Sequence, residues 1–498
     1  MAELDVFLQS FGSLSLFGAL LVLLLVLVIF PSSFGSKKPR NEPPGPTPLP
    51  LIGNLLQIDM WNRHKSLQKF YKKYGSVFTI YMGPKKMVVL AGYKTVKEAL
   101  VNYADEFGER HPNGLNELKL GVLWSNGDSW KEMRRFSLIN LRDYGMGKKA
   151  CEDKIIEESF YLSEELKKFK GDQLLTNAVS NIISSMVYGS RFDYEDPEFI
   201  ALIDRMSRSI KLMATPSMQF YNAFPAIGKW FSGAQKEFQK LQVLVREYNL
   251  KVFHQLKETL NPHMCRGFVD AFFVRQQQQL KSGVINPHFL DANLHRTVQQ
   301  LFGAGTETTA TTFRWILLFM IKYPKIQDQI QEEISRVVGS RKLQYEDRNN
   351  LPFTNAVIHE SQRLASILPT SVPRRTSKDV TFQGYFIEKG TVVIPLLASV
   401  LHDETEWEKP HSFHPAHFLD KDGKFVKRDA FMPFSAGRRV CLGEGLARME
   451  LFLFFATLLQ NFRLTPPPGV SEDDLDLTPQ VLAPLSPRPY KLCVVPRT

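Results

Sequence analysis

One cysteine, Cys441, stands in a loop of turn-forming residues, and this loop constrains the fold of the chain more than any other feature. The loop reads Phe434-Ser-Ala-Gly437-Arg-Arg439-Val-Cys441-Leu-Gly443 and runs directly into an apolar helical pattern. The start of a helix supplies partial positive charge and free N–H groups, which stabilise a thiolate. Gly437 permits a tight turn with positive φ, and Gly443 leaves space for a flat group against the backbone. The pattern therefore predicts a cysteine that acts as a ligand.

The rest of the loop allows two interpretations. Phe434 is placed to shield the sulfur, and Arg439 is placed to pair with an acidic group. A lone cysteine in a glycine-containing loop is more often a small core residue, so other motifs have to decide. The other cysteines form no C-x-x-C pair, which disfavours a disulfide framework or a cysteine-rich zinc site.

The N-terminal segment is strongly apolar. Residues 6–36 carry no charge, and residues 14–30 are long enough to cross a bilayer as a helix. A cleaved secretory signal is the alternative, but the short arm carries Glu3 and Asp5 and no small-residue cleavage pattern follows. Basic residues at positions 37, 38 and 40 then place the body in the cytosol by the positive-inside rule. We expect residues 1–36 to be a retained membrane anchor, in the endoplasmic reticulum of a eukaryote.

A basic and proline-rich hinge, residues 37–53, follows the anchor. Four prolines alternate with other residues between positions 44 and 50, a pattern that forms a stiff extended connector rather than a helix. A flexible leader without an orienting role is the alternative. No linker divides the remaining chain, so residues 54–498 are predicted to form one catalytic domain, although 498 residues often make several.

The charge balance is basic. The formal net charge of +11 suits an anionic membrane surface, an acidic protein partner or nucleic acid. The basic residues are dispersed, and no nucleic-acid module is recognisable, so we expect no nucleic-acid partner.

The body is predicted to be mainly α with a small β region. Residues 77–82 and 87–90 have the pattern of two strands around Gly83-Pro84, and residues 93–103 have helical periodicity. Helical patterns then dominate as far as Tyr323. Strand-like sequence returns at 379–394, where Val380-Thr-Phe, Gly384 and Thr391-Val-Val-Ile are spaced for a hairpin.

The longest predicted helix covers residues 292–323 and ends before Pro324. At 1.5 Å per residue it is roughly 48 Å long, enough to cross the body. Its centre, Phe302-Gly-Ala304-Gly-Thr-Glu307-Thr308-Thr, combines glycines with hydroxylated residues that weaken a helix, which predicts a local opening. Close packing at a helix crossing is the alternative explanation of the glycines.

Two spaced pairs add to these motifs. Glu360 and Arg363 lie one turn apart and share a helix face. The same E-x-x-R spacing recurs at 132–135 and 333–336, where surface ion pairs are expected. Trp130 and Arg134 form the chain's only W-x-x-x-R, and an indole N–H and a guanidinium on one face are able to hold a carboxylate.

Together these motifs resemble the cytochrome P-450 family, and in particular its microsomal, vertebrate family 2 members. The cysteine loop fills every fixed position of F-x-x-G-x-R-x-C-x-G, and Ala304 to Thr308 fills A-G-x-[D/E]-T. The resemblance implies the family fold and haem b as cofactor, with Cys441 as the axial ligand of the iron. It also implies that these residues contact the cofactor: Phe434, Gly437, Arg439, Gly443 and Ala304.

The resemblance implies roles for the other motif residues as well. Thr308 would steady dioxygen and its water, and Glu307 would relay protons. The haem propionates would be held by Trp130, Arg134, Arg110, Arg374 and Arg439. Glu360 and Arg363 would form a structural pair beneath the haem, and His417 stands where the family has an arginine as the third contact.

The implied activity is monooxygenation of small lipophilic molecules, such as xenobiotics, fatty acids or steroids. The chain has no flavin or nicotinamide motif, so the electrons would come from NADPH-cytochrome P-450 reductase, with cytochrome b5 as a further candidate donor. Two alternatives stay open. One is a haem-thiolate peroxide isomerase or dehydratase that needs no reductase, and the other is a haem sensor or carrier without turnover.

Overall fold

The computed structural model describes Gly18 and residues 41–111, 120–143, 149–167, 173–225, 228, 233–283, 286–480 and 484–497. The predicted membrane span and the basic residues after it lie, apart from Gly18, outside this part of the chain. Within the described ranges, no helix is both long enough and apolar enough to cross a membrane.

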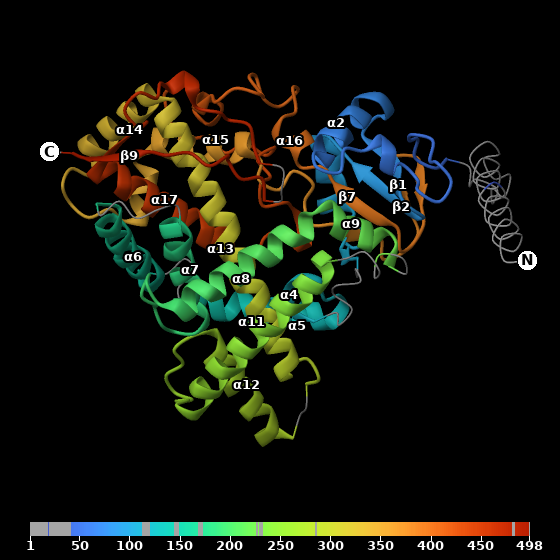
Figure 1. Cartoon of the computed structure of the whole chain (residues 1–498), viewed down its shortest axis with the longest axis horizontal. Helices are drawn as coiled ribbons and strands as arrows, with labels where there is room; N and C mark the ends of the chain where they lie inside the picture. Colours follow the sequence, from blue (N-terminus) through green and yellow to red (C-terminus); the bar gives the residue numbers. More distant parts are fainter. Residues whose placement is uncertain are drawn as a thin grey trace, which may run out of the picture.

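Helices form most of the body, and a small sheet lies at one side of it (Figure 1). This arrangement confirms the prediction of a mainly α fold with a small β region. The helices are α2 (Arg63–Tyr74), α3 (Tyr93–Lys97), α4 (Gly121–Trp124), α5 (Gly127–Asp143), α6 (Lys149–Lys167), α7 (Gln173–Val187), α8 (Pro197–Ala214), α9 (Pro216–Ala223), α11 (Gly233–Glu258), α12 (Phe268–Ser282), α13 (Asp291–Lys322), α14 (Pro324–Val337), α15 (Pro352–Ala365), α16 (Ala398–Leu401) and α17 (Glu444–Asn461).

The main sheet has the strand order β1-β2-β7-β4-β3. Its strands are β1 (Val77–Met82), β2 (Lys85–Leu90), β7 (Val392–Pro395), β4 (Arg374–Arg375) and β3 (Glu109–Arg110). The two N-terminal strands pair antiparallel, as their sequence predicts, and β7 pairs with β2 in parallel. The sheet therefore joins segments that lie about three hundred residues apart in sequence.

The predicted hairpin at 379–394 is partly wrong. β5 (Val380–Phe382) pairs with β6 (Tyr385–Ile387) around Gln383 and Gly384, which both have positive φ. β7 instead leaves this hairpin and enters the main sheet. All four β7 residues are buried, so β7 needs neighbours that cover both of its faces. A second pair, β8 (Phe462–Thr465) with β9 (Cys493–Pro496), was not predicted.

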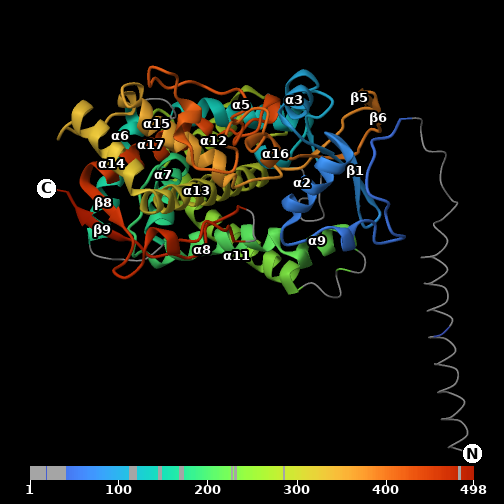
Figure 2. The same ribbon diagram turned by 90° about the horizontal axis from the view of Figure 1, so that it is seen from above.

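The long helix α13 is continuous, so the predicted local opening is wrong. The Thr308 hydroxyl donates to the Ala304 carbonyl at 2.7 Å without interrupting the helix. A Cβ on Gly305 would collide with the Ile183 side chain of α7, so close packing explains this glycine. Figure 2 shows α13 between a layer that contains α15 and α17 and a layer that contains α8 and α11, and each of these helices contacts it.

The described part of the hinge, residues 41–53, is extended and attached to the sheet. The Thr79 N–H of β1 donates to the Pro44 carbonyl at 2.7 Å. The Asn54 side-chain amide donates to the carbonyls of Pro46 and Thr47 at 3.3 and 3.2 Å. These bonds attach the segment to the body, and its role as a stiff connector stays a prediction.

Glu360 and Arg363 of α15 form a fully buried ion pair. The Arg363 Nε donates to Glu360 Oε2 at 2.7 Å, and neither side chain is exposed to solvent. His417 supplies a third contact, since its Nδ1 lies 3.1 Å from the same oxygen while its Nε2 accepts the Lys409 N–H. Nδ1 therefore carries the proton and donates to the carboxylate. The histidine that stands in place of the family's arginine therefore reaches the Glu360 carboxylate.

A surface ion pair was expected at 333–336, and this expectation is wrong for Glu333. Its side chain is buried and accepts hydrogen bonds from the backbone N–H groups of Phe353 and Thr354 at 3.0 and 2.8 Å. The carboxylate thus satisfies the N–H groups at the start of α15.

We expect Glu360→Ala to lower the free energy of unfolding by about 3–5 kcal/mol, because it leaves the Arg363 charge buried and unpaired. Thermal unfolding of the haem-loaded protein checks this. Glu132→Ala, which truncates another glutamate of an E-x-x-R spacing but at a partly exposed position, should change the value by less than about 0.5 kcal/mol. Equal effects of the two substitutions would show that the buried Glu360–Arg363 pair contributes no more to the free energy of unfolding than a partly exposed glutamate.

Candidate functional site

Two short strands place a pair of arginines side by side. Arg110 of β3 is the register partner of Arg374 of β4, and both side chains are buried. Arg110 Nη1 donates to the Val372 carbonyl at 2.7 Å, and Arg374 Nη2 donates to the Ala436 carbonyl at 3.0 Å. The second bond fastens the sheet to the cysteine loop.

Arg439 and the W-x-x-x-R pair complete this group. The Arg439 guanidinium carbon lies 3.9 Å from the centroid of the Trp130 ring, and Arg134 Nη2 donates to the Val440 carbonyl at 2.9 Å. Asn126 joins the parts, because its Oδ1 accepts from the Arg110 N–H and from Arg439 Nη2 at 2.7 and 2.9 Å. Sequence reasoning missed Asn126, whose only signal is its place in a Ser-Asn-Gly turn before α5.

These residues form a cationic cluster, which we define as Arg110, Arg134, Arg374 and Arg439 around Trp130. Within the part of the chain that the structure describes, none of the four arginines has a salt bridge. Burial and mutual repulsion hold the pKa of Arg110 well below its usual range. Burial lowers the pKa of Arg374 to about 10, and burial together with the neighbouring arginines lowers the pKa of Arg439 to about 9.

Several donors of the cationic cluster have no hydrogen-bond acceptor among the residues that the structure describes. These buried atoms are Arg110 Nε, Arg374 Nε, Arg439 Nη1 and Trp130 Nε1. Buried donors and charges without partners cost free energy, so the cluster requires an anion that the described chain does not itself supply. Two carboxylates on one ligand, such as the propionates of haem, satisfy this requirement.

The cysteine loop has the predicted backbone. Gly437 has φ +72°, and a Cβ there would collide with the Leu100 carbonyl oxygen, so glycine is required. A Cβ on Gly443 would meet no atom within 4 Å, which leaves one side of the loop open for a flat group. The Cys441 N–H donates to the Phe434 carbonyl at 3.0 Å and closes the turn.

Cys441 lies at the surface of the loop, and the atoms around its thiol reduce the contact of the thiol with water. The residue keeps exposed surface, yet the burial of the thiol raises its pKa, and this effect outweighs hydrogen bonds from the Gly443 and Glu444 N–H groups and the charge of Arg134. The N–H groups at the start of α17 thus favour the thiolate as expected, although by themselves they do not outweigh the burial of the thiol. A metal cation at the open side would reverse the balance, because a coordinated thiol loses its proton.

The middle of α13 offers a second open surface. Ala304 is exposed, whereas Phe302 and Gly303 before it are buried, and Thr308 one turn later is half-buried. α13 packs against α17, the helix that follows the cysteine loop. An open sulfur, an open glycine, an exposed alanine and donors without acceptors fit a flat dianionic group that carries a thiolate-binding metal.

Glu307 and Thr308 are not brought into direct contact. Glu307 is buried on another face of α13, where the Ser207 hydroxyl of α8 donates to its Oε2 at 2.6 Å. Arg314 Nη1 lies 3.9 Å from Glu307 Oε1. Sequence reasoning missed both partners. Arg314 had a signal, since seven residues along a helix is two turns on one face, whereas Ser207 had none.

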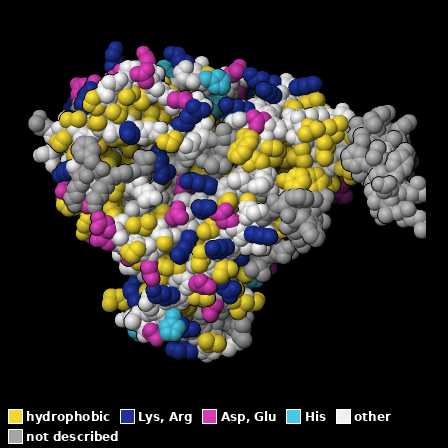
Figure 3. Space-filling model, viewed as in Figure 1, with side chains coloured by type: hydrophobic (Ala, Val, Ile, Leu, Met, Phe, Trp, Pro, Cys, Tyr) yellow, Lys and Arg dark blue, Asp and Glu magenta, His cyan; other side chains and the backbone are white. Residues whose placement is uncertain are grey.

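Charges of both signs mix on the molecular surface. On the face shown in Figure 3, Lys and Arg side chains alternate with Asp and Glu and with apolar side chains. Two basic residues near the motifs are already paired, Arg438 with Asp105 and Lys131 with Asp128. The absence of a nucleic-acid partner stays a prediction.

Comparisons with known proteins agree with the geometry along the whole chain. The family model for cytochrome P-450 matches residues 43–494. Cytochrome P-450 2K1 and cytochrome P-450 2K4 of Oncorhynchus mykiss are 57% and 56% identical over the full length of both chains. Cytochrome P-450 2C29 of Mus musculus is 44% identical, and the match covers 95% of this chain and 97% of that protein. The similarity therefore reaches far beyond the cysteine loop.

We expect Trp130→Phe to accelerate the loss of haem by about ten- to a hundredfold, because one hydrogen bond to a charged acceptor contributes about 1.5–3 kcal/mol. Transfer of haem to an apo-globin acceptor measures this rate. The matched control is Trp407→Phe, which removes an indole bond to the Val400 carbonyl away from the cationic cluster and should lower stability without changing haem transfer. An unchanged rate in Trp130→Phe would show that this indole does not hold the cofactor.

Proposed function

The chain belongs to the cytochrome P-450 family, and from this premise we propose that it inserts one atom of dioxygen into small lipophilic substrates with electrons from NADPH-cytochrome P-450 reductase. As a member of the family it is a haem-thiolate monooxygenase with haem b as cofactor. The observation that carries the proposal for this chain is the cationic cluster, whose unpaired donors lie at the cysteine loop.

Cys441 is proposed as the axial ligand of the haem iron. A thiolate ligand supplies electron density that favours O–O cleavage. The residues of the chain prepare the sulfur for this role: the Gly443 and Glu444 N–H groups and the Arg134 guanidinium all favour its charged form. The Phe434 carbonyl accepts the Cys441 N–H and so closes the turn.

The cationic cluster is proposed to bind the two propionates. Trp130 Nε1 and the free nitrogens of Arg110, Arg374 and Arg439 supply the donors. Arg134 is partly committed to the Val440 carbonyl and contributes mainly charge. Gly437, Gly443 and Ala304 provide the surfaces against which a flat ring is able to lie.

Thr308 and Glu307 are proposed to deliver protons to dioxygen. The Thr308 hydroxyl lies beside the exposed Ala304 carbonyl, and so it stands at the open surface of α13. Glu307 lies on another face of the helix, where its Oε2 accepts the Ser207 hydroxyl and its Oε1 lies near Arg314. Ser207 therefore becomes part of the proposed proton path.

Localisation and partners are proposed from the sequence. Residues 1–36 would anchor the chain in the endoplasmic reticulum membrane, residues 37–53 would orient the body, and residues 54–498 would form the cytosolic catalytic domain. The bonds from Pro44 and Pro46 to the body support an orienting hinge. Because the chain carries no flavin or nicotinamide motif, a separate reductase must supply the electrons, with cytochrome b5 as a second candidate donor.

Reconstitution of the purified full chain with the reductase and NADPH tests the function. We expect a thiolate-type carbon monoxide spectrum and substrate-dependent consumption of oxygen and NADPH, and Cys441→Ser should abolish the spectrum. Peroxide rearrangement without reductase would instead support an isomerase or dehydratase. A thiolate spectrum without turnover on xenobiotics, fatty acids and steroids would support a haem sensor or carrier.

We expect Thr308→Ala to lower the yield of product per NADPH by at least about tenfold, since positioned proton donors contribute about 10²–10⁴-fold in rate. The diverted electrons should appear as hydrogen peroxide or water. Thr312→Ala is the matched control, because its hydroxyl makes the same type of bond to the Thr308 carbonyl one turn further along α13. Unchanged coupling in Thr308→Ala would remove the proposed oxygen role.

A further inference from the structure

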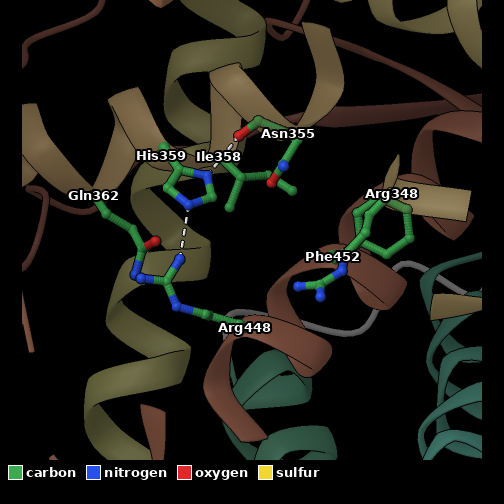
Figure 4. A pocket seen from close by; sticks show the side chains of 7 residues that line it. All are labelled: Arg348, Asn355, Ile358, His359, Gln362, Arg448 and Phe452. Carbon is green, nitrogen blue, oxygen red and sulfur yellow. Dashed lines mark hydrogen bonds between the residues drawn. The ribbon is translucent and has the colours of Figure 1, made fainter. Parts of the chain in front are cut away.

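A small hollow lies between α15 and α17, on the helix that follows the cysteine loop. Residues of both helices line it. Figure 4 shows that His359 and Gln362 of α15 and Arg448 of α17 point into it. His359 does not take part in the function proposed above, although it stands directly before Glu360.

The hydrogen bonds of His359 define its proton position. Its Nδ1 lies 2.7 Å from the Asn355 carbonyl, which only accepts, so Nδ1 carries the proton. Its Nε2 lies 2.7 Å from Arg448 Nη1, which only donates, so Nε2 is the acceptor. Burial, reinforced by the charge of Arg448, lowers the pKa of His359 to about 3. The ring is thus a neutral acceptor for Arg448 at physiological pH.

The surroundings of His359 hold the ring in place. Three aromatic rings pack around it, with centroid distances of 5.4, 4.7 and 4.9 Å to Phe418, Phe425 and Phe431. An imidazole whose two nitrogens are bonded and whose faces are packed has little freedom to rotate. It therefore fixes the position of any group bonded to Nε2.

Arg448 is held from two sides. Its Nε and Nη2 donate to Glu444 Oε1 at 3.0 and 2.9 Å, and its Nη1 donates to His359. The guanidinium carbon then lies 5.3 Å from the centroid of the Phe434 ring, within the range of a cation–π interaction. Glu444 belongs to the first turn of α17, so without His359 a partly exposed ion pair and the contacts with the Phe431 and Phe434 rings would hold the arginine.

Phe434 connects this arrangement to the cysteine. Its carbonyl accepts the Cys441 N–H, so the backbone of the aromatic residue and that of the ligand are bonded to each other. The negative charge of Glu444 acts on Cys441 and disfavours further negative charge there, and the Arg448 guanidinium that is paired with Glu444 offsets this charge. One-electron reduction adds a negative charge at the iron, and a fixed cation favours the reduced state.

We propose that His359 is a positioning residue that holds the Arg448 guanidinium against Phe434 and thereby raises the reduction potential of the haem iron bound at Cys441. The proposal rests on the proposed role of Cys441. It requires no protonation change at His359, which acts only as a neutral hydrogen-bond acceptor. Its effect is electrostatic, and substrate and dioxygen do not contact it.

The test is a spectroelectrochemical titration of the full, haem-loaded chain, with the carbon monoxide spectrum recorded for each variant. His359→Phe keeps an aromatic ring among the three phenylalanines but removes the acceptor for Arg448. We expect the equilibrium constant for haem reduction to fall by about two- to fivefold, the order of magnitude expected when a partly screened charge moves away from the added charge. His359→Gln restores an acceptor and should return the constant close to the wild-type value.

Gln362→Leu is the matched control. Gln362 lines the same hollow one turn along α15, but its Oε1 has no hydrogen-bond partner. This substitution should therefore leave the equilibrium constant unchanged. If it lowers the constant as much as His359→Phe, the packing of the hollow and not the bond to Arg448 sets the potential, and the proposal is overturned.

A second variant covers the case in which His359→Phe does not fold. Arg448→Met removes the cation itself and should lower the constant at least as far. An unchanged constant in whichever variant folds, with an intact thiolate spectrum, overturns the role of His359 while the proposed function stands. A wild-type chain without a thiolate spectrum would overturn both.

Discussion

The uncompensated positive charge of the cationic cluster is the constraint on which the rest of the structure depends. Arg110 and Arg374 are buried side by side in a two-residue strand pairing, and Arg439 stacks on Trp130 next to them. Where the described part of a folded chain buries several cations without an anion, a ligand that supplies the anion is required. The sheet, α5 and the cysteine loop meet here, so binding of the anionic cofactor and consolidation of the fold are one event.

The cysteine, like the cationic cluster, depends on a charge that the cofactor supplies. Burial raises the pKa of the Cys441 thiol, and the helix start does not offset this effect. The protein therefore positions the sulfur of Cys441, while the positive charge of a bound metal favours the loss of the thiol proton. The buried Glu360–Arg363 ion pair also needs hydrogen-bond partners for its remaining polar atoms, and His417 supplies one of them. Each charged element is stable only when its partners are in place.

Sequence patterns predicted local structure well and pairing less well. The strands predicted at 77–82 and 87–90 and the end of α13 before Pro324 follow from periodicity and a helix-stopping residue, and the second strand begins two residues earlier than predicted. The pairing of β7 with β2 was not predicted, because the sequence pattern of a buried strand does not depend on whether its neighbouring strand is near or distant in the chain. The opening in α13 was wrong because the Thr308 hydroxyl bonds to a carbonyl within the intact helix. The surface ion pair predicted for Glu333 was wrong, because this side chain is buried and its carboxylate accepts a backbone N–H group of α15.

The sequence by itself determined the turn at Gly437, the cysteine that follows it and the helix that carries Thr308, because turns and periodicity depend on neighbouring residues. Only the tertiary structure decided that Arg110 lies against Arg374, that Glu307 binds Ser207, and that donors at the cysteine loop lack acceptors. These relations join residues far apart in the chain. Burial and unmet hydrogen bonds exist only after distant segments pack, so no local pattern encodes them.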